Sequence, residues 1–248
     1  MALEQRPYTR TAESVGIDAG LRAYMLKVYN YMTTALLLTG LVAFFFGKAS
    51  IVTNELGQIV GLTGIGNALF NSPLQWIVML APLGLVFYFS FKINTMSLST
   101  AQTTFWVFST LMGLSLASIF IVYTGASIAR VFFISSATFA AMSLYGYTTK
   151  RDLTALGGFL MMGLIGIIIA SIVNIFMKSS VMYFAISIIG VLIFVGLTAY
   201  DTQKIKNMYY AADSETQSGK KAIMGALRLY LDFINLFIML LRLFGQRR

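Results

Sequence analysis

The chain has 248 residues, of which 58% are hydrophobic and only 11% are charged. A soluble domain usually carries about twice that charged share. The apolar residues stand in long uncharged blocks rather than in short periodic stripes, which argues against a large soluble core. The blocks are also too long and too unalternating for barrel strands. We therefore predict an all-α polytopic membrane protein.

The net charge of +9 would point to a nucleic-acid partner in a soluble protein. Here most basic residues lie between the apolar blocks, so membrane orientation and anionic lipid explain them, and we expect no nucleic-acid partner. The chain has no Cys and no His, which removes thiol chemistry, thiolate metal sites and the usual histidine proton switch. Any proton or metal chemistry must therefore rest on nine acidic residues.

The apolar blocks divide the chain into a lead and seven spans. We expect residues 1–27 to form a polar lead that stays on the mature protein, because it lacks the pattern of a cleaved signal. Residues 28–248 are expected to form one seven-helix transmembrane domain, with a Gly- and Asn-rich surface loop at 49–73. The expected spans are Val28–Phe46, Leu74–Phe91, Phe105–Tyr123, Val131–Tyr147, Leu153–Phe176, Val181–Tyr200 and Ala222–Leu243.

The distribution of basic residues favours one orientation in the membrane. The lead carries four, the loop after the fourth span two and the loop after the sixth span four, whereas the alternate loops carry one each. The N-terminus is therefore predicted to be cytoplasmic. Seven full spans then place Arg247 and Arg248 on the far side, a conflict that a re-entrant last segment would remove. We favour seven full spans.

The last apolar block contains an unusual polar stripe. Arg228, Asp232, Asn235 and Arg242 step by four, three and seven residues, which places them on one helical face. A carboxylate near mid-membrane costs several kcal/mol unless it faces a bundle interior or a watery cavity. We therefore expect this helix to lie inside the protein, with its polar stripe facing partners or water.

Two further charged residues are predicted to lie near this stripe. Lys92 and Asp201 end the second and sixth spans at the same cytoplasmic depth, and Asp232 lies about 15 Å into the last span. Two adjacent carboxylates cannot both ionise cheaply, so they would share a proton and act as a pH sensor without histidine. When both are ionised they suit a hard cation such as Ca²⁺. A pair between Lys92 and Asp201 would instead close an ion path from the cytoplasmic side.

Simpler interpretations of these charges remain open. Asp201 can end the sixth span with its carboxylate in water beside Lys204. Asp232 can pair with Arg228, one helical turn away, as a neutral packing element.

An enzyme is another alternative, because intramembrane aspartyl proteases also place two Asp residues on successive helices. One of theirs follows a Tyr, as Asp201 follows Tyr200 here. Their second Asp follows a Gly-x-Gly motif, whereas Leu229–Leu231 precedes Asp232. We therefore expect no enzyme activity.

The run LYLDFINLFIMLLRLFG at 229–245 resembles the C-terminal signature of the Bax inhibitor-1 family, also called the transmembrane Bax-inhibitor-motif family, in its bacterial branch. Runs at 113–132, 143–166 and 197–206 extend the resemblance over about residues 20 to 245. It implies seven transmembrane helices with the C-terminal helix central. It also implies a pH-sensitive calcium leak in the bacterial inner membrane, with lipid, Ca²⁺ and protons as partners and no cofactor.

The resemblance also implies roles for individual residues. It maps a di-aspartyl sensor onto Asp201, within AYD, and Asp232, within YLDF, and we expect Arg228 and Asn235 to support the pair. It maps a basic partner onto Lys92, where some relatives carry arginine, although lysine lacks the bidentate fork of arginine. Some bacterial relatives are linked to a membrane-bound AAA protease. The alternative function is therefore that of a modulator or substrate of such a protease, which would grip residues 1 to 20.

Overall fold

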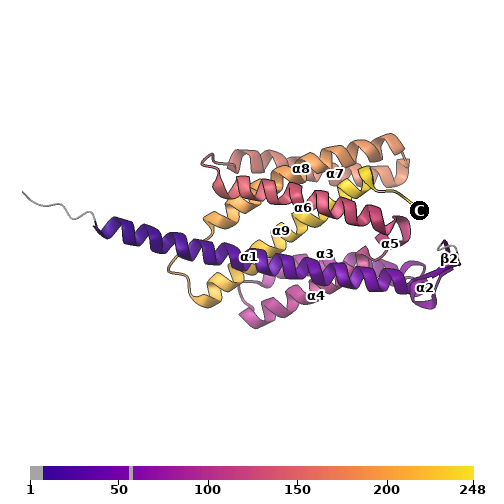
Figure 1. The fold of residues 1–248 in the computed structure, drawn as a ribbon, viewed down its shortest axis with the longest axis horizontal. Helices are drawn as coiled ribbons and strands as arrows, with labels where there is room; N and C mark the ends of the chain where they lie inside the picture. The colour runs from indigo at the N-terminus through magenta and orange to yellow at the C-terminus, as the bar shows by residue number, and fades with distance from the viewer. Residues whose placement is uncertain (1–7, 56–57) are drawn as a thin grey trace, which may run out of the picture.

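The computed structural model describes residues 8–55 and 58–248, with side chains from residue 19 onward. Most of this part of the chain is helical (Figure 1). Seven helical segments in it are long and apolar enough to cross a membrane, as predicted. They are α1 (Tyr8–Ala49), α3 (Leu74–Lys92), α4 (Leu98–Leu116) with the one-turn α5 (Ile119–Val122), α6 (Gly125–Thr148), α7 (Thr154–Met177), α8 (Ser180–Asn207) and α9 (Glu215–Phe244).

The loop at 49–73 has more local structure than its composition indicated. Strands β1 (Ile51–Thr53) and β2 (Ile59–Leu62) pair antiparallel, and the short helix α2 (Gly64–Phe70) follows them. The expected polar lead, residues 1–27, is helical from Tyr8 onward and continues into the first span as α1. Residues 1–7 lie outside the described part.

Several helices extend past the apolar blocks that predicted them, because backbone hydrogen bonding continues where the side chains become polar. The sixth span, expected to end at Tyr200, continues as α8 to Asn207. Asp201 therefore lies inside a helix rather than at its end.

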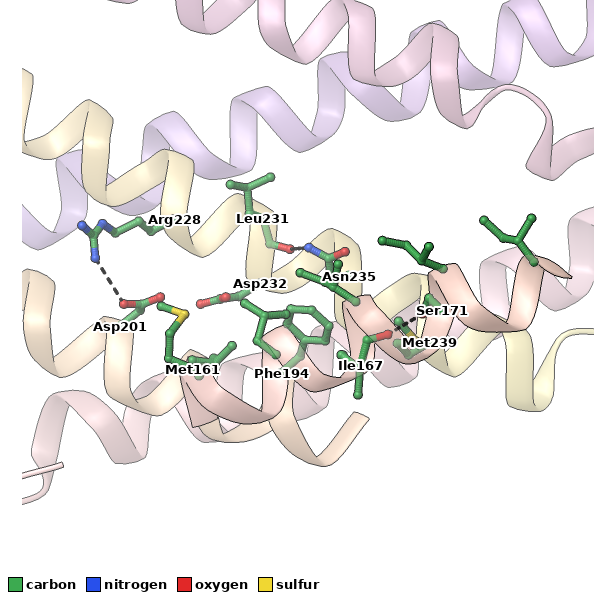
Figure 2. Close-up of a pocket in the computed structure, with 15 residues that line it drawn as sticks. Met161, Ile167, Ser171, Phe194, Asp201, Arg228, Leu231, Asp232, Asn235 and Met239 are labelled. Carbon is green, nitrogen blue, oxygen red and sulfur yellow. Dashed lines mark hydrogen bonds and ion pairs between the residues drawn. The ribbon is translucent and has the colours of Figure 1, made fainter. Parts of the chain in front are cut away.

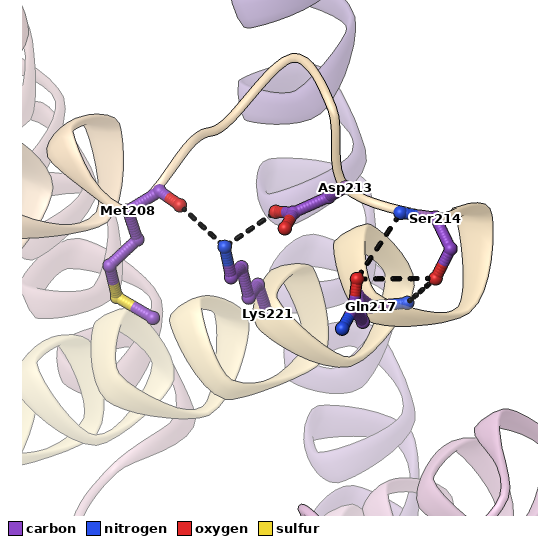
Figure 3. Close-up of polar contacts among 5 residues, drawn as sticks. All are labelled: Met208, Asp213, Ser214, Gln217 and Lys221. Carbon is purple, nitrogen blue, oxygen red and sulfur yellow. Dashed lines mark hydrogen bonds and ion pairs between the residues drawn. The ribbon is translucent and has the colours of Figure 1, made fainter.

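The helix α9 likewise begins before the expected Ala222. The Ser214 hydroxyl accepts a hydrogen bond from the Gln217 N–H at 3.3 Å, and the Gln217 side chain accepts one from the Ser214 N–H. Such a capping box satisfies backbone donors that a helix start leaves free. Lys221 then joins the Asp213 carboxylate to the Met208 carbonyl, which ties the end of α8 to the start of α9 (Figure 3).

The last helix is the most enclosed of the seven spans. It runs between a group formed by α1, α3 and α4 and a group formed by α6, α7 and α8 (Figure 1), and it packs against α1, α4, α6 and α8. The helix α3 packs mainly on α4 instead, and α7 packs mainly on α8. The expectation that the C-terminal helix is central to all the other spans is therefore not confirmed. A re-entrant segment must turn within the membrane, whereas α9 is one unbroken helix of 30 residues.

Buried hydroxyl groups join helices that are far apart in the sequence. The Tyr230 hydroxyl of α9 lies 2.7 Å from the Thr39 hydroxyl of α1, which donates to the Ser109 carbonyl of α4. Buried polar groups need such partners because they have left water. Tyr230 and Asp232 are two residues apart and therefore point to nearly opposite sides of α9. Anchoring Tyr230 on α1 turns Asp232 toward α7 and α8.

The helices α6 and α8 pack closely at Gly146. A Cβ atom added there would collide with the backbone of Ala199 on α8. Small residues at such crossings let helix backbones pack tightly in membranes. Gly158 on α7 provides a contrast, because a Cβ atom there meets no atom within 4 Å.

We predict that Gly146→Ala lowers the thermal stability of the purified protein. Forcing an extra methyl group into a packed contact costs about 1–3 kcal/mol, whereas alanine by itself favours a helix. The measurement is the midpoint temperature for loss of the monodisperse folded protein in detergent. Gly158→Ala is the matched control and should leave that midpoint unchanged or raise it. Equal midpoints for the two variants would contradict the assigned role of Gly146.

Candidate functional site

The polar stripe of α9 faces a cavity of about 570 Å³ between α7, α8 and α9. Around this helix the residues off the stripe are mostly buried, while Arg228, Asn235 and Arg242 on the stripe are half-exposed. Arg228, Asp232 and Asn235 all line the cavity, as their spacing indicated, and Asp201 lines it from α8 (Figure 2). The α7 wall is largely apolar and includes Met161, Ile168 and Ile172, with Ser171 among them.

Asp232 lines this cavity and is only 5% exposed. One of its carboxylate oxygens has no hydrogen-bond partner among the described residues. A buried carboxylate without full pairing is unfavourable as a bare anion. The site therefore favours a proton or a cation at this oxygen.

Asp201 is the second carboxylate of the site, and its side chain is 13% exposed. It points toward Asp232 in the cavity (Figure 2), and the two groups interact electrostatically. One acidic side chain from each of two neighbouring helices thus meets in one buried space. Like charges at such short range favour one shared proton over two full negative charges.

Arg228 forms an ion pair with Asp201, with 3.6 Å between the nearest nitrogen and oxygen. This arrangement differs from both simpler interpretations of the sequence. Asp201 is not a free interfacial group beside Lys204, whose ammonium contacts the Tyr200 ring and hydroxyl. Arg228 is also not paired with Asp232 alone, because its ion pair is with Asp201 on α8.

The structure does not bring Lys92 to this site. It lies in the last turn of α3, is exposed and does not line the cavity. The helix α3 packs on α4, away from α8. The expected pair between Lys92 and Asp201 is therefore not formed in this structure, and Arg228 supplies the positive charge. The position of Arg228 on the same stripe as Asp232 was the sequence signal for this role.

Asn235 and Ser171 add neutral polar groups to the cavity lining. The Asn235 amide nitrogen donates to the Leu231 carbonyl at 2.8 Å, and the Ser171 hydroxyl donates to the Ile167 carbonyl at 2.6 Å (Figure 2). Both side-chain oxygens keep acceptor capacity. Ser171 was not singled out from the sequence, because one serine in an apolar span usually serves packing.

The oxygen-bearing side chains of this site are fewer than the ligands of a typical calcium ion. Calcium takes six to eight oxygen ligands, whereas the described residues contain no group of three or more acidic, His or Cys side chains that could hold a metal. Two carboxylates, an amide and a hydroxyl offer a partial shell that water would complete.

Comparison with known proteins supports the resemblance read from the motifs. The sequence profile of the family described as "Inhibitor of apoptosis-promoting Bax1" matches residues 21–248. The "Inner membrane protein YbhL" of Escherichia coli (strain K12) is 48% identical over 243 residues, which covers 97% of this chain and 99% of that protein.

Two further relatives extend this similarity to other bacteria. A protein of Rickettsia prowazekii (strain Madrid E) is 52% identical over 240 residues, 97% of this chain and 96% of its own length. A membrane protein of Streptococcus pyogenes serotype M1 is 35% identical over 235 residues, 92% of this chain and 95% of its own length. These matches span nearly the whole chain, and the chain therefore belongs to the Bax inhibitor-1 family.

Proposed function

We propose that this chain is a pH-sensitive calcium-leak channel of a bacterial inner membrane, with its N-terminus in the cytoplasm. The observation that carries the proposal is the pair of carboxylates, Asp201 and Asp232, that face one cavity inside the span bundle. Family membership and the name of the Escherichia coli relative support the membrane assignment. No catalytic activity and no cofactor are proposed.

The gate consists of Asp201, Asp232 and Arg228. The charged groups that face Asp201 are Arg228 and Asp232 on α9 and Lys204 on its own helix, while α7 contributes apolar side chains and Ser171. When Asp201 is ionised, its ion pair with Arg228 holds α8 against α9. Protonation removes the negative charge, so the attraction is lost and the contact between these helices loosens. The leak should therefore rise as the pH falls.

The same groups pass a cation onward. An ion that enters the cavity exchanges part of its water for carboxylate oxygens, then for the side-chain oxygens of Asn235 and Ser171. Conduction requires sites that bind strongly enough to admit an ion and weakly enough to release it. An incomplete shell of protein ligands meets the second requirement.

A regulatory role toward a membrane-bound AAA protease is compatible with this leak. The segment proposed as its handle, residues 1 to 20, falls partly on residues 1–7, outside the described part, and continues as the first turns of α1. The carboxylate pair gives no reason to prefer that role over ion conduction.

We predict that Ca²⁺ efflux from proteoliposomes of the wild type rises as the pH falls from about 8 to 6, by up to about tenfold per pH unit if one proton controls the gate. Asp201→Asn and Asp232→Asn should each flatten this dependence, because an amide cannot titrate. Asp213→Asn is the control, since Asp213 pairs with Lys221 outside the cavity. Unchanged pH profiles in both cavity variants would rule out the sensor.

A second prediction separates the two basic residues assigned to the latch. Arg228→Gln should raise the leak at about pH 8 toward its acidic value, because Asp201 loses its ion-pair partner. Lys92→Gln, which removes an exposed cation outside the cavity, should leave the profile close to that of the wild type. The same efflux assay measures both variants. The opposite ranking would assign the latch to Lys92 instead.

A further inference from the structure

A second cavity, of about 360 Å³, lies between the end of α7, the start of α8 and the end of α9. It shares Ser171 and Ile175 with the first cavity, so the two form one crevice along the stripe of α9. The charged side chains that line the second cavity are basic, whereas the first cavity contains two acidic side chains. Lys178, after the end of α7, and Arg242, in the last turn of α9, face the second cavity together with Asn174.

Positive charge is concentrated around this cavity. The Arg242 guanidinium lies 5.2 Å from the centre of the Tyr183 ring, and the Arg247 guanidinium lies 5.8 Å from the same centre. Hydrogen bonding with the Tyr123 side chain raises the pKa of Arg247, so this group stays charged. Two guanidinium groups beside one ring, with Lys178 close by, repel one another unless an anion lies between them.

The protein supplies no such anion from its own described side chains. The ends of the spans on this side carry one acidic residue, Glu55, within the described ranges. They carry six basic ones, Lys48, Arg130, Lys178, Arg242, Arg247 and Arg248. Both ion pairs found in the described structure, Lys221 with Asp213 and Arg228 with Asp201, involve residues in the first half of α9. The cations around the cavity are thus left for an external partner.

Backbone hydrogen bonds hold the C-terminal tail so that the Arg247 guanidinium lies beside the second cavity. The Thr124 N–H donates to the Gln246 carbonyl, and the Arg248 N–H donates to the Val122 carbonyl, each at 3.0 Å. These bonds fix Arg247 between them as a β-bridge to Tyr123. Lys178 has a left-handed backbone, with φ of 50°, which glycine would adopt more easily. The chain therefore carries a cation here at some cost in backbone energy.

We propose that this cavity binds the phosphate group of an anionic phospholipid. A guanidinium and an ammonium are the usual ligands of phosphate oxygens. The Asn174 amide oxygen already accepts the Ser179 N–H at 3.0 Å, so its amide N–H groups remain as donors toward the cavity.

The position of the cavity favours a lipid as the source of the phosphate. It lies where α7 and α9 end and α8 begins, the level at which headgroups border the hydrocarbon. Its surroundings are strongly apolar and open to the outside, with Ile175 68% exposed, Phe176 81% and Val181 77%. Acyl chains beside these side chains would keep the headgroup at the cavity, whereas a free phosphate ion gains nothing from them.

The test is native mass spectrometry of the full-length protein in detergent, titrated with phosphatidylglycerol or with phosphatidylcholine. The wild type should bind phosphatidylglycerol about tenfold more tightly than phosphatidylcholine. Arg242→Gln should abolish most of that preference, because it removes about one to two charge-assisted hydrogen bonds to the phosphate. Lys178→Gln should also weaken the preference for phosphatidylglycerol. Because Lys178 is exposed, this variant is less prone to misfold than the Arg242 variant. Arg130→Gln is the matched control, because it removes an exposed cation of the same end that does not line the cavity.

The possible outcomes either support or overturn this site. Loss of the preference in the Arg242 and Lys178 variants, with the Arg130 variant unchanged, supports it. Equal loss in all three variants indicates a diffuse charge effect, and no preference in the wild type removes the site altogether. Displacement of phosphatidylglycerol by millimolar inorganic phosphate would assign the cavity to a free ion instead of a lipid. None of these readouts depends on calcium efflux, so they are independent of the proposed channel function.

Discussion

The arrangement of the bundle depends on placing one ionisable group, Asp232, in the middle of an apolar helix. A carboxylate at this depth is tolerable only inside protein or beside water, so α9 must be enclosed by other helices. The structure encloses α9 on nearly every side and leaves its stripe facing the crevice along α7 and α8. The outer helices carry no such demand and present apolar side chains outward, as the exposed isoleucines of α7 illustrate.

The rotation of α9 about its axis is as important as its enclosure. Tyr230 is fully buried, and its hydroxyl contacts Thr39 on α1. On the crevice side, Arg228 reaches Asp201 on α8. A helix held by polar contacts on two opposite faces cannot turn without breaking one of them. The hydroxyl contact therefore acts as a positioning device for the carboxylate pair, although it lies outside the cavity.

The sequence predicted the parts of this structure that depend on periodicity and failed where lateral placement decides. Long apolar blocks gave the seven spans, and the four-three-seven spacing gave the polar face of α9. Asp201 was assigned to a helix end because hydropathy falls there, whereas backbone hydrogen bonds carry α8 on to Asn207. Lys92 was assigned to the right helix end, but hydropathy does not encode which side of the bundle α3 occupies. Depth alone therefore did not indicate that Arg228 is the basic neighbour of Asp201.

The two cavities give a single crevice opposite charges at its ends. Asp201 and Asp232 attract cations at one end, while Lys178 and Arg242 repel them at the other. Asp232 and Arg242 are ten residues apart on one helix, about 15 Å at the helical rise. If the chain conducts cations as we propose, a cation that leaves the carboxylates along this route meets an electrostatic barrier in a medium that screens poorly. A phosphate held at Arg242 would offset that barrier, so lipid at one end and protons at the other would act on the same path.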